Sequence, residues 1–303
     1  MKWMTVMISL SLGGIIATGP TWGYEGITVN NGGSLTGIVT LLGKTPKPKG
    51  YNLVTFPDAV YCGRISDGRG WRLLQPFRVG DNQGFKNVVI QFQKIKRGKP
   101  FPKMTPRIEA KDCRFDPYII IVRNREKINI VNMDPVLHDI QAYETSRLGA
   151  RVLFNVPLPM SKYLRKEHFL DGASVKKRAG RDMTQKIKMS KGRNIFVMQC
   201  GFHAYMESWG LAVKNPYYAV STDDGTYAIT DIPPGTYQVT IWHPMLTKEL
   251  TVTIKAGKET KLNIDIDAPK GRLYANEVSD NTRFGMELLQ GSRITPTVEL
   301  QKR

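Results

Sequence analysis

Histidine, cysteine and acidic residues are scarce in this chain of 303 residues, and their scarcity limits the chemistry it can perform. There are four histidines and three cysteines, and 26 acidic residues stand against 44 lysines and arginines. The sequence has no Cys-x-x-Cys-His motif for haem attachment and no glycine-rich nucleotide loop. It also lacks a Ser, His and Asp order and any carboxylate pair typical of a catalytic site. We therefore expect a protein that is not an enzyme.

Long apolar runs are also missing, except for one at the N-terminus. Lys2 precedes an uncharged run from about Val6 to Ala17, and turn-forming residues follow it. This pattern is typical of a secretory signal peptide, which we place at residues 1–23. The alternative is an uncleaved membrane anchor, but the run is shorter than the roughly 20 residues that span a bilayer. We therefore expect a periplasmic or secreted protein.

The formal net charge of +18 changes little when the signal peptide is removed, because Lys2 is the only charged residue before Glu25. A basic surface favours an acidic protein or an anionic envelope surface as partner, and export makes nucleic acid an unexpected one. Basic residues are concentrated between Arg151 and Arg193, where twelve stand against three acidic ones. We predict a solvated excursion there, with a docking role as the alternative.

Turn residues and short apolar runs predict an all-β fold. The chain has 28 glycines and 18 prolines, and turn signals such as Asp223-Asp224-Gly225 separate short stretches that alternate or are continuously apolar. Several short strands with regular turn signals are typical of a β-sandwich. The expected strands are 34–42, 87–92, 118–122, 127–131, 193–198, 237–242, 250–254 and 262–266.

Side chains that bind soft metals follow the strand expected at 193–198. Cys200, His203 and Met206 form the pattern Cys-x₂-His-x₂-Met, and His138 comes from a loop after an earlier strand. Two imidazoles, a thiolate and a weak axial thioether are the ligands of type 1 (blue) copper electron-transfer centres. The alternative interpretation is a group of buried side chains that binds no metal.

On these residues the sequence resembles the cupredoxin family over roughly residues 107–215. The supporting patterns are Asn132-x-Asp134-x₃-His138, Phe196-x₃-Cys200 and Cys113-x-Phe115-x-Pro117. The resemblance implies a Greek-key β-sandwich in which His138, Cys200 and His203 bind one copper ion and Met206 is axial. Asn132 is then expected to form a hydrogen bond near the copper thiolate. Cys200 follows His138 by 62 positions, a longer gap than compact members of the family have.

The other two cysteines are expected to pair. In an oxidising compartment two of the three can form a disulfide and one is left over. With Cys200 engaged as a ligand, we predict the disulfide Cys62–Cys113.

The histidine count excludes copper enzymes of two kinds. A type 1 site uses two of the four histidines, and a further three-histidine catalytic copper, as in copper nitrite reductases, needs five in all. A trinuclear oxidase cluster needs still more. Of the remaining two, we expect His243 to be structural and His168 to be solvated.

A second resemblance lies downstream. The stretches Thr222-Asp223-x-Gly225-x-Tyr227 and Pro234-Gly235-x-Tyr237 resemble a carboxypeptidase regulatory-like (transthyretin-like) β-domain, usually a non-catalytic accessory module. The expected order is a signal peptide at 1–23, an N-terminal β region at 24–106, a cupredoxin-like copper domain at 107–215, a smaller β-sandwich at 216–267 and a tail at 268–303. The strand at 34–42 also fits the smaller sandwich, with the copper block inserted into it.

We expect periplasmic one-electron transfer, with an acidic redox protein such as a cytochrome as the partner. Copper delivery or storage is one alternative. The other is a non-catalytic β-sandwich module that binds or supports a polymer or the envelope.

Overall fold

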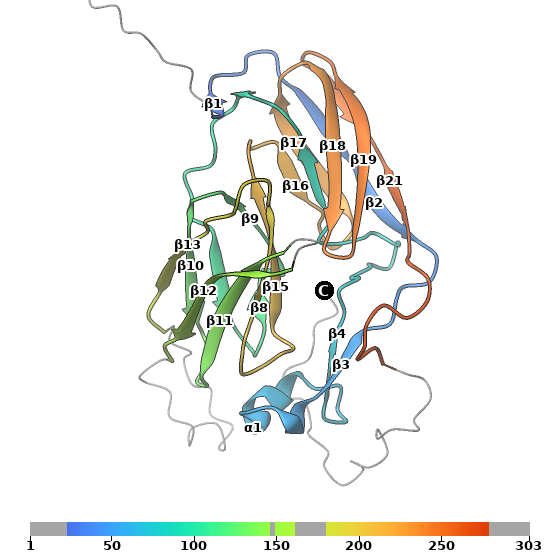
Figure 1. Ribbon diagram of the computed structural model, residues 1–303. Coiled ribbons are helices and arrows are strands. Elements are labelled where there is room, and N and C mark those ends of the chain that lie inside the picture. Colours follow the sequence, from blue (N-terminus) through green and yellow to red (C-terminus); the bar gives the residue numbers. More distant parts are fainter. Residues whose placement is uncertain (1–22, 146–148, 161–179, 279–303) are drawn as a thin grey trace, which may run out of the picture.

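Strands dominate the computed structural model, which describes residues 23–145, 149–160 and 180–278 (Figure 1). Apart from Gly23, the predicted signal peptide lies outside the described residues, as do His168 and residues 279–303 of the predicted tail. Within the described ranges, no helix is long and apolar enough to cross a membrane.

The first β-sandwich contains the predicted metal ligands. Its sheets have the strand orders β13-β10-β7-β8 and β12-β11-β14-β15-β9. The strands are β7 (Arg107–Ala110), β8 (Phe115–Asp116), β9 (Ile119–Arg123), β10 (Lys127–Asn132), β11 (His138–Glu144), β12 (Arg151–Leu158), β13 (Met183–Lys186), β14 (Ile195–Gln199) and β15 (Glu207–Val213). Apolar side chains from both sheets, such as Ile130 and Ile140, form one buried core between them.

The second β-sandwich joins strands from both ends of the chain. One sheet has the order β16-β5-β18-β19, and the other has β17-β2-β20 with β21 also paired to β2. The strands are β2 (Gly33–Leu42), β5 (Val89–Phe92), β16 (Tyr218–Val220), β17 (Thr226–Ile232), β18 (Gly235–His243), β19 (Leu246–Ile254), β20 (Glu259–Lys261) and β21 (Ile264–Asp267). Because β5 and β16 are paired neighbours, the first sandwich is an insertion that leaves and re-enters the second at adjacent strands.

The predicted N-terminal β region, 24–106, does not form one unit. While β2 and β5 belong to the second sandwich, β3 (Lys49–Asn52) and β4 (Trp71–Leu74) form a separate pair. A further pair joins β1 (Glu25–Gly26) to β6 (Arg97–Gly98).

The chain between β3 and β4 packs against the first sandwich. It contains α1 (Ala59–Cys62) between 3-10 turns at Leu53–Thr55 and Gly63–Ile65. Leu53 and Ile65 are buried in the core of the first sandwich. We call residues 53–65 the cover segment. No strand was expected in this stretch, and the structure has a short helix there.

The two sandwiches share a small apolar interface. Val89 and Trp242 of the second sandwich pack with Ile119 and Leu211, which lie on the neighbouring strands β9 and β15 of the first. The sheet that also contains β11 and β14 is therefore supported from outside its own core.

All eight expected strands are present, with ends shifted by a few residues. The basic segment 151–193 is not a single excursion, which corrects the prediction. Its first residues form β12, where Phe154 and Leu158 are buried, and β13 pairs with β10. Apolar residues at alternating positions in β12, such as Phe154, Val156 and Leu158, explain this outcome. Residues 161–179 of that segment lie outside the described residues.

Strands β14 and β15, which flank the ligand loop, approach each other closely at Phe196 and Gly210. The two residues are register partners, and a Cβ on residue 210 would overlap the buried ring of Phe196. We predict that Gly210→Ala lowers the free energy of unfolding by about 1–3 kcal/mol through overpacking. Urea unfolding measures the change. In a Phe196→Leu background the same substitution should cost less, and strictly additive costs would contradict the contact.

Candidate metal centre

The predicted ligands meet at one end of the first sandwich. His138 is the first residue of β11, where the sequence predicted a loop, and Cys200 follows the last residue of β14. Because β11 and β14 are antiparallel neighbours, the start of one and the end of the other lie at the same edge. His203 and Met206 lie in the loop that connects β14 to β15. In that loop Cys200 N donates to Met206 O, and Met206 N donates to His203 O.

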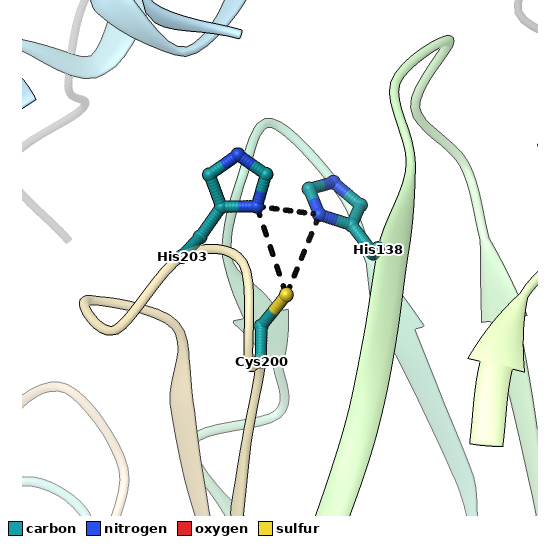
Figure 2. A group of neighbouring side chains, drawn as sticks. All are labelled: His138, Cys200 and His203. Carbon is teal, nitrogen blue, oxygen red and sulfur yellow. Dashed lines mark hydrogen bonds between the residues drawn. The ribbon is translucent and has the colours of Figure 1, made fainter. Parts of the chain in front are cut away.

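Three donor atoms converge in a small triangle (Figure 2). The Nδ1 atoms of His138 and His203 are 3.2 Å apart, and the Cys200 Sγ lies 3.9 Å and 3.6 Å from them, respectively. The centre of a triangle with these sides lies about 2.1 Å from each corner, close to the bond lengths of about 2.0–2.3 Å between a first-row metal ion and such ligands. The three side chains are almost completely buried.

Hydrogen bonds on the far side of each imidazole fix its tautomer. The His203 Nε2 lies 3.1 Å from Pro57 O, which can only accept, so this nitrogen carries the hydrogen. The His138 Nε2 lies 3.0 Å from the Asp134 carboxylate, which likewise accepts. Both Nδ1 atoms therefore point lone pairs at each other and at the Cys200 sulfur. A bound cation satisfies this arrangement, so the residues fit a metal ion.

Asp134 orients His138 and is itself held from several directions. Its carboxylate accepts hydrogen bonds from the N–H groups of Cys113 and Asp112 and from the Tyr61 hydroxyl, at 2.7–2.9 Å. Burial acts to raise the pKa of Asp134, but His138 and these N–H groups outweigh it and hold the pKa below its usual value. Asp134 is part of the pattern Asn132-x-Asp134-x₃-His138, but the sequence alone assigned it no role.

Asn132 forms hydrogen bonds within the loop before His138. Its side-chain amide donates to Val136 O at 2.9 Å, and its carbonyl oxygen accepts from Asp134 N at 2.9 Å. These hydrogen bonds stabilise the turn that presents Asp134 to His138, and the expected role of Asn132 near the thiolate stays a prediction.

Backbone N–H groups surround the Cys200 sulfur. Burial raises the pKa of the Cys200 thiol to about 11, against the opposite effect of the N–H groups of Asp139 and Phe202. The Asp139 carboxylate also accepts a hydrogen bond from Gly201 N, which ties the two ligand-bearing segments together. Without a metal ion the thiol keeps its proton at neutral pH, and a metal ion must displace it.

Met206 completes the predicted set. Its side chain has no exposed surface and belongs to the same buried cluster as Cys200. The structure thus brings three predicted donor atoms into a triangle and buries the fourth ligand candidate in the same short loop.

The cover segment closes the centre from outside. Besides the contact of Pro57 with His203, the Cys62 Sγ lies 3.8 Å from the His203 Nε2. The structure contains the predicted disulfide between Cys62 and Cys113, which ties α1 to the turn that holds Asp134. Both imidazoles are consequently shielded from solvent, a feature that sequence reasoning missed because the segment lies far from either histidine in the chain.

His243 lies in the second sandwich and has a structural role, as expected. It has no exposed surface, and its ring lies 5.1 Å and 4.9 Å from the rings of Phe77 and Phe85. Its Nε2 is 3.2 Å from Pro76 O. Burial lowers the pKa of His243 to about 4, so it is neutral at physiological pH.

Comparisons with known proteins find matches to parts of the chain. A family model described as polysaccharide lyase family 4, domain II, matches residues 193–262, from β14 to β20. A search of curated proteins finds no match.

Three solved structures illustrate the similarity of the chain to known folds. A purple cupredoxin from Nitrosopumilus maritimus is 14% identical, with 36% of this chain and 99% of that chain covered and a TM-score of 0.25. A reduced amicyanin variant is 10% identical, with 41% and 98% covered and a TM-score of 0.24. Reduced auracyanin from Roseiflexus castenholzii is 10% identical, with 36% and 96% covered and a TM-score of 0.25.

These are distant similarities, and the site stands on its own residues. The strand arrangement and the donor atoms define a cupredoxin-like β-sandwich joined to a second β domain. The buried cluster of His138, Cys200, His203 and Met206 is consistent with a type 1 copper site.

Metal affinity should depend on pH through the Cys200 thiol. Its pKa is about 11, while burial and the neighbouring His138 lower the pKa of His203. Above neutral pH each metal ion therefore displaces one proton, and we predict an affinity that rises about tenfold per pH unit between pH 7 and 9. Competition titrations with Zn²⁺, which is redox-inert, measure the slope. The slope should vanish in Cys200→Ser, and a pH-independent affinity in the wild type would exclude Cys200 as a ligand.

Proposed function

We propose that this chain is an exported type 1 copper protein that transfers single electrons. The observation that carries the proposal is the triangle of two imidazole nitrogens and one thiol sulfur, in which both imidazoles are held from behind with their lone pairs inward. Soft sulfur ligands combined with imidazoles favour copper over hard cations. A copper ion bound there supplies reversible one-electron oxidation and reduction.

The residues around the ligands contribute rigidity. Asp134 holds His138 in one orientation, and Pro57 does the same for His203. The N–H groups around Cys200 favour its thiolate form. Because these groups lie on paired strands and a disulfide-linked segment, the ligands need move little when the charge of the centre changes. Small rearrangement favours fast electron transfer.

The cover segment favours electron transfer over copper delivery. Delivery requires an incoming ligand to reach the ion, and the outward edge of His203 is blocked by Pro57 and Cys62. Electron transfer needs no such access. We infer that the hydrogen bond from His203 to Pro57 O is a route by which an electron reaches the surface.

The chain's charge supports an acidic partner. With a net charge of +18, the protein attracts acidic proteins at long range, and salt weakens that attraction. An acidic redox protein such as a cytochrome in the periplasm fits both this charge and the predicted export. The second sandwich, with its resemblance to regulatory-like domains, is assigned an accessory role without catalysis.

Voltammetry of the copper-loaded protein tests this function. We predict a reversible one-electron wave, and a higher potential in Met206→Leu because loss of the axial thioether destabilises Cu(II). Met198→Leu is the matched control, since Met198 is equally buried on β14 but is not a proposed ligand. Cys200→Ser should abolish the wave. Equal potentials in the two methionine variants would contradict the axial role, and tight Cu(I) binding without a reversible wave would favour storage.

A further inference from the structure

The two imidazoles of the metal centre are supported by acceptors of different charge. The His203 Nε2 lies 3.1 Å from Pro57 O, a neutral carbonyl oxygen, and the His138 Nε2 lies 3.0 Å from the Asp134 carboxylate. Because the two distances are nearly equal, a neutral acceptor is sufficient to orient an imidazole in this fold. The negative charge behind His138 therefore has a role beyond orientation.

Holding this charge in the interior makes demands on the surrounding chain. Asp134 has no exposed surface, and burial by itself favours the neutral acid. Three donors besides His138 converge on the carboxylate, namely Asp112 N at 2.7 Å, Cys113 N at 2.8 Å and the Tyr61 hydroxyl at 2.9 Å. A carboxylate that accepts several such hydrogen bonds stays ionised at neutral pH. The chain is thus built to keep a negative charge at this position.

The charges of the proposed ligands indicate what this carboxylate does. Two neutral imidazoles, the neutral thioether of Met206 and the thiolate of Cys200 carry a single negative charge between them. Cu(I) balances that charge, whereas Cu(II) leaves a net positive charge in a buried site. The Asp134 carboxylate lies one hydrogen bond behind a ligand and compensates for this extra charge. It therefore stabilises the oxidised centre relative to the reduced one.

We propose that Asp134, acting through its hydrogen bond with His138, lowers the reduction potential of the bound copper, and that Tyr61 moderates this effect. The inference rests on the proposed copper function. A carboxylate that accepts from the far nitrogen of an imidazole also makes that imidazole a stronger donor, which favours Cu(II). The Tyr61 hydroxyl donates to one oxygen of the carboxylate, Oδ1, and His138 Nε2 contacts the other, Oδ2. The hydroxyl thereby withdraws part of the charge that acts on His138.

Voltammetry of the copper-loaded protein tests the two roles through shifts of opposite sign. Asp134→Asn retains an acceptor for His138 but removes the charge, so we expect a higher reduction potential. Tyr61→Phe removes one donor and leaves the carboxylate more negative, so we expect a lower potential. Tyr227→Phe is the matched control, because Tyr227 is a buried tyrosine of the second sandwich whose hydroxyl donates to Leu262 O. This control should leave the potential unchanged.

Affinities for the two oxidation states show where the effect arises. Loss of a partner behind a ligand typically costs about 10–100-fold in metal affinity. We expect Asp134→Asn to weaken Cu(II) binding by about that factor and Cu(I) binding by less, as measured by competition titrations. Zn²⁺ is redox-inert and carries the same charge as Cu(II), so its affinity should fall as that of Cu(II) does. The Zn²⁺ titration therefore tests Asp134 independently of electron transfer.

The Tyr61→Phe variant keeps the test decisive if Asp134→Asn does not fold, because it removes a single hydroxyl and retains the buried ring. The inference is overturned if Tyr61→Phe raises the potential or matches Tyr227→Phe, or if Asp134→Asn weakens Cu(I) and Cu(II) binding equally. A type 1 absorption band with unshifted potentials in both variants would remove the role of Asp134 and leave the proposed function intact.

Discussion

The hydrogen bonds behind the two imidazoles determine what the centre can bind. Pro57 O and the Asp134 carboxylate each accept from an Nε2 hydrogen, which leaves both Nδ1 lone pairs facing inward, 3.2 Å apart. Two lone pairs at that distance repel each other unless a proton or a metal ion lies between them. Placing the Cys200 sulfur at the third corner selects a soft metal ion over a proton.

Much of the structure serves to maintain those two hydrogen bonds. The disulfide Cys62–Cys113 joins the segment that carries Pro57 to the turn whose N–H groups hold Asp134. Tyr61, which lies with Cys62 on the short helix α1, donates a hydrogen bond directly to the Asp134 carboxylate. The insertion of the metal-binding sandwich between β5 and β16 brings the N-terminal segment to the same end of the molecule. Both hydrogen bonds to the Nε2 atoms thus depend on chain segments that lie outside the ligand motif.

The sequence predicted the elements that local patterns specify. Short apolar runs identified strands such as β2, β5 and β18, and the spacing of Cys200, His203 and Met206 identified the ligand loop. Local patterns did not identify the helix at Ala59–Cys62. Strand β12 was missed because it begins the segment 151–193, whose basic residues further along predicted a solvated excursion.

The partners of the ligands were beyond prediction for a different reason. Pro57 is 146 residues from His203, and nothing in the local sequence marks its carbonyl oxygen as a hydrogen-bond acceptor for an imidazole. Asp134 was visible in a motif, but its role becomes clear only from the four donors that converge on it. Such roles depend on tertiary contacts rather than on sequence spacing.

The central claim is that His138, Cys200, His203 and Met206 together hold one copper ion in a type 1 site. Addition of Cu(II) to the purified protein, followed by visible absorption and electron paramagnetic resonance, tests it most directly. The account predicts one copper per chain, an intense thiolate-to-copper band and the narrow hyperfine splitting of a type 1 centre. Absence of the band and of bound copper would contradict it, and would leave an exported β-sandwich binding module as the better description.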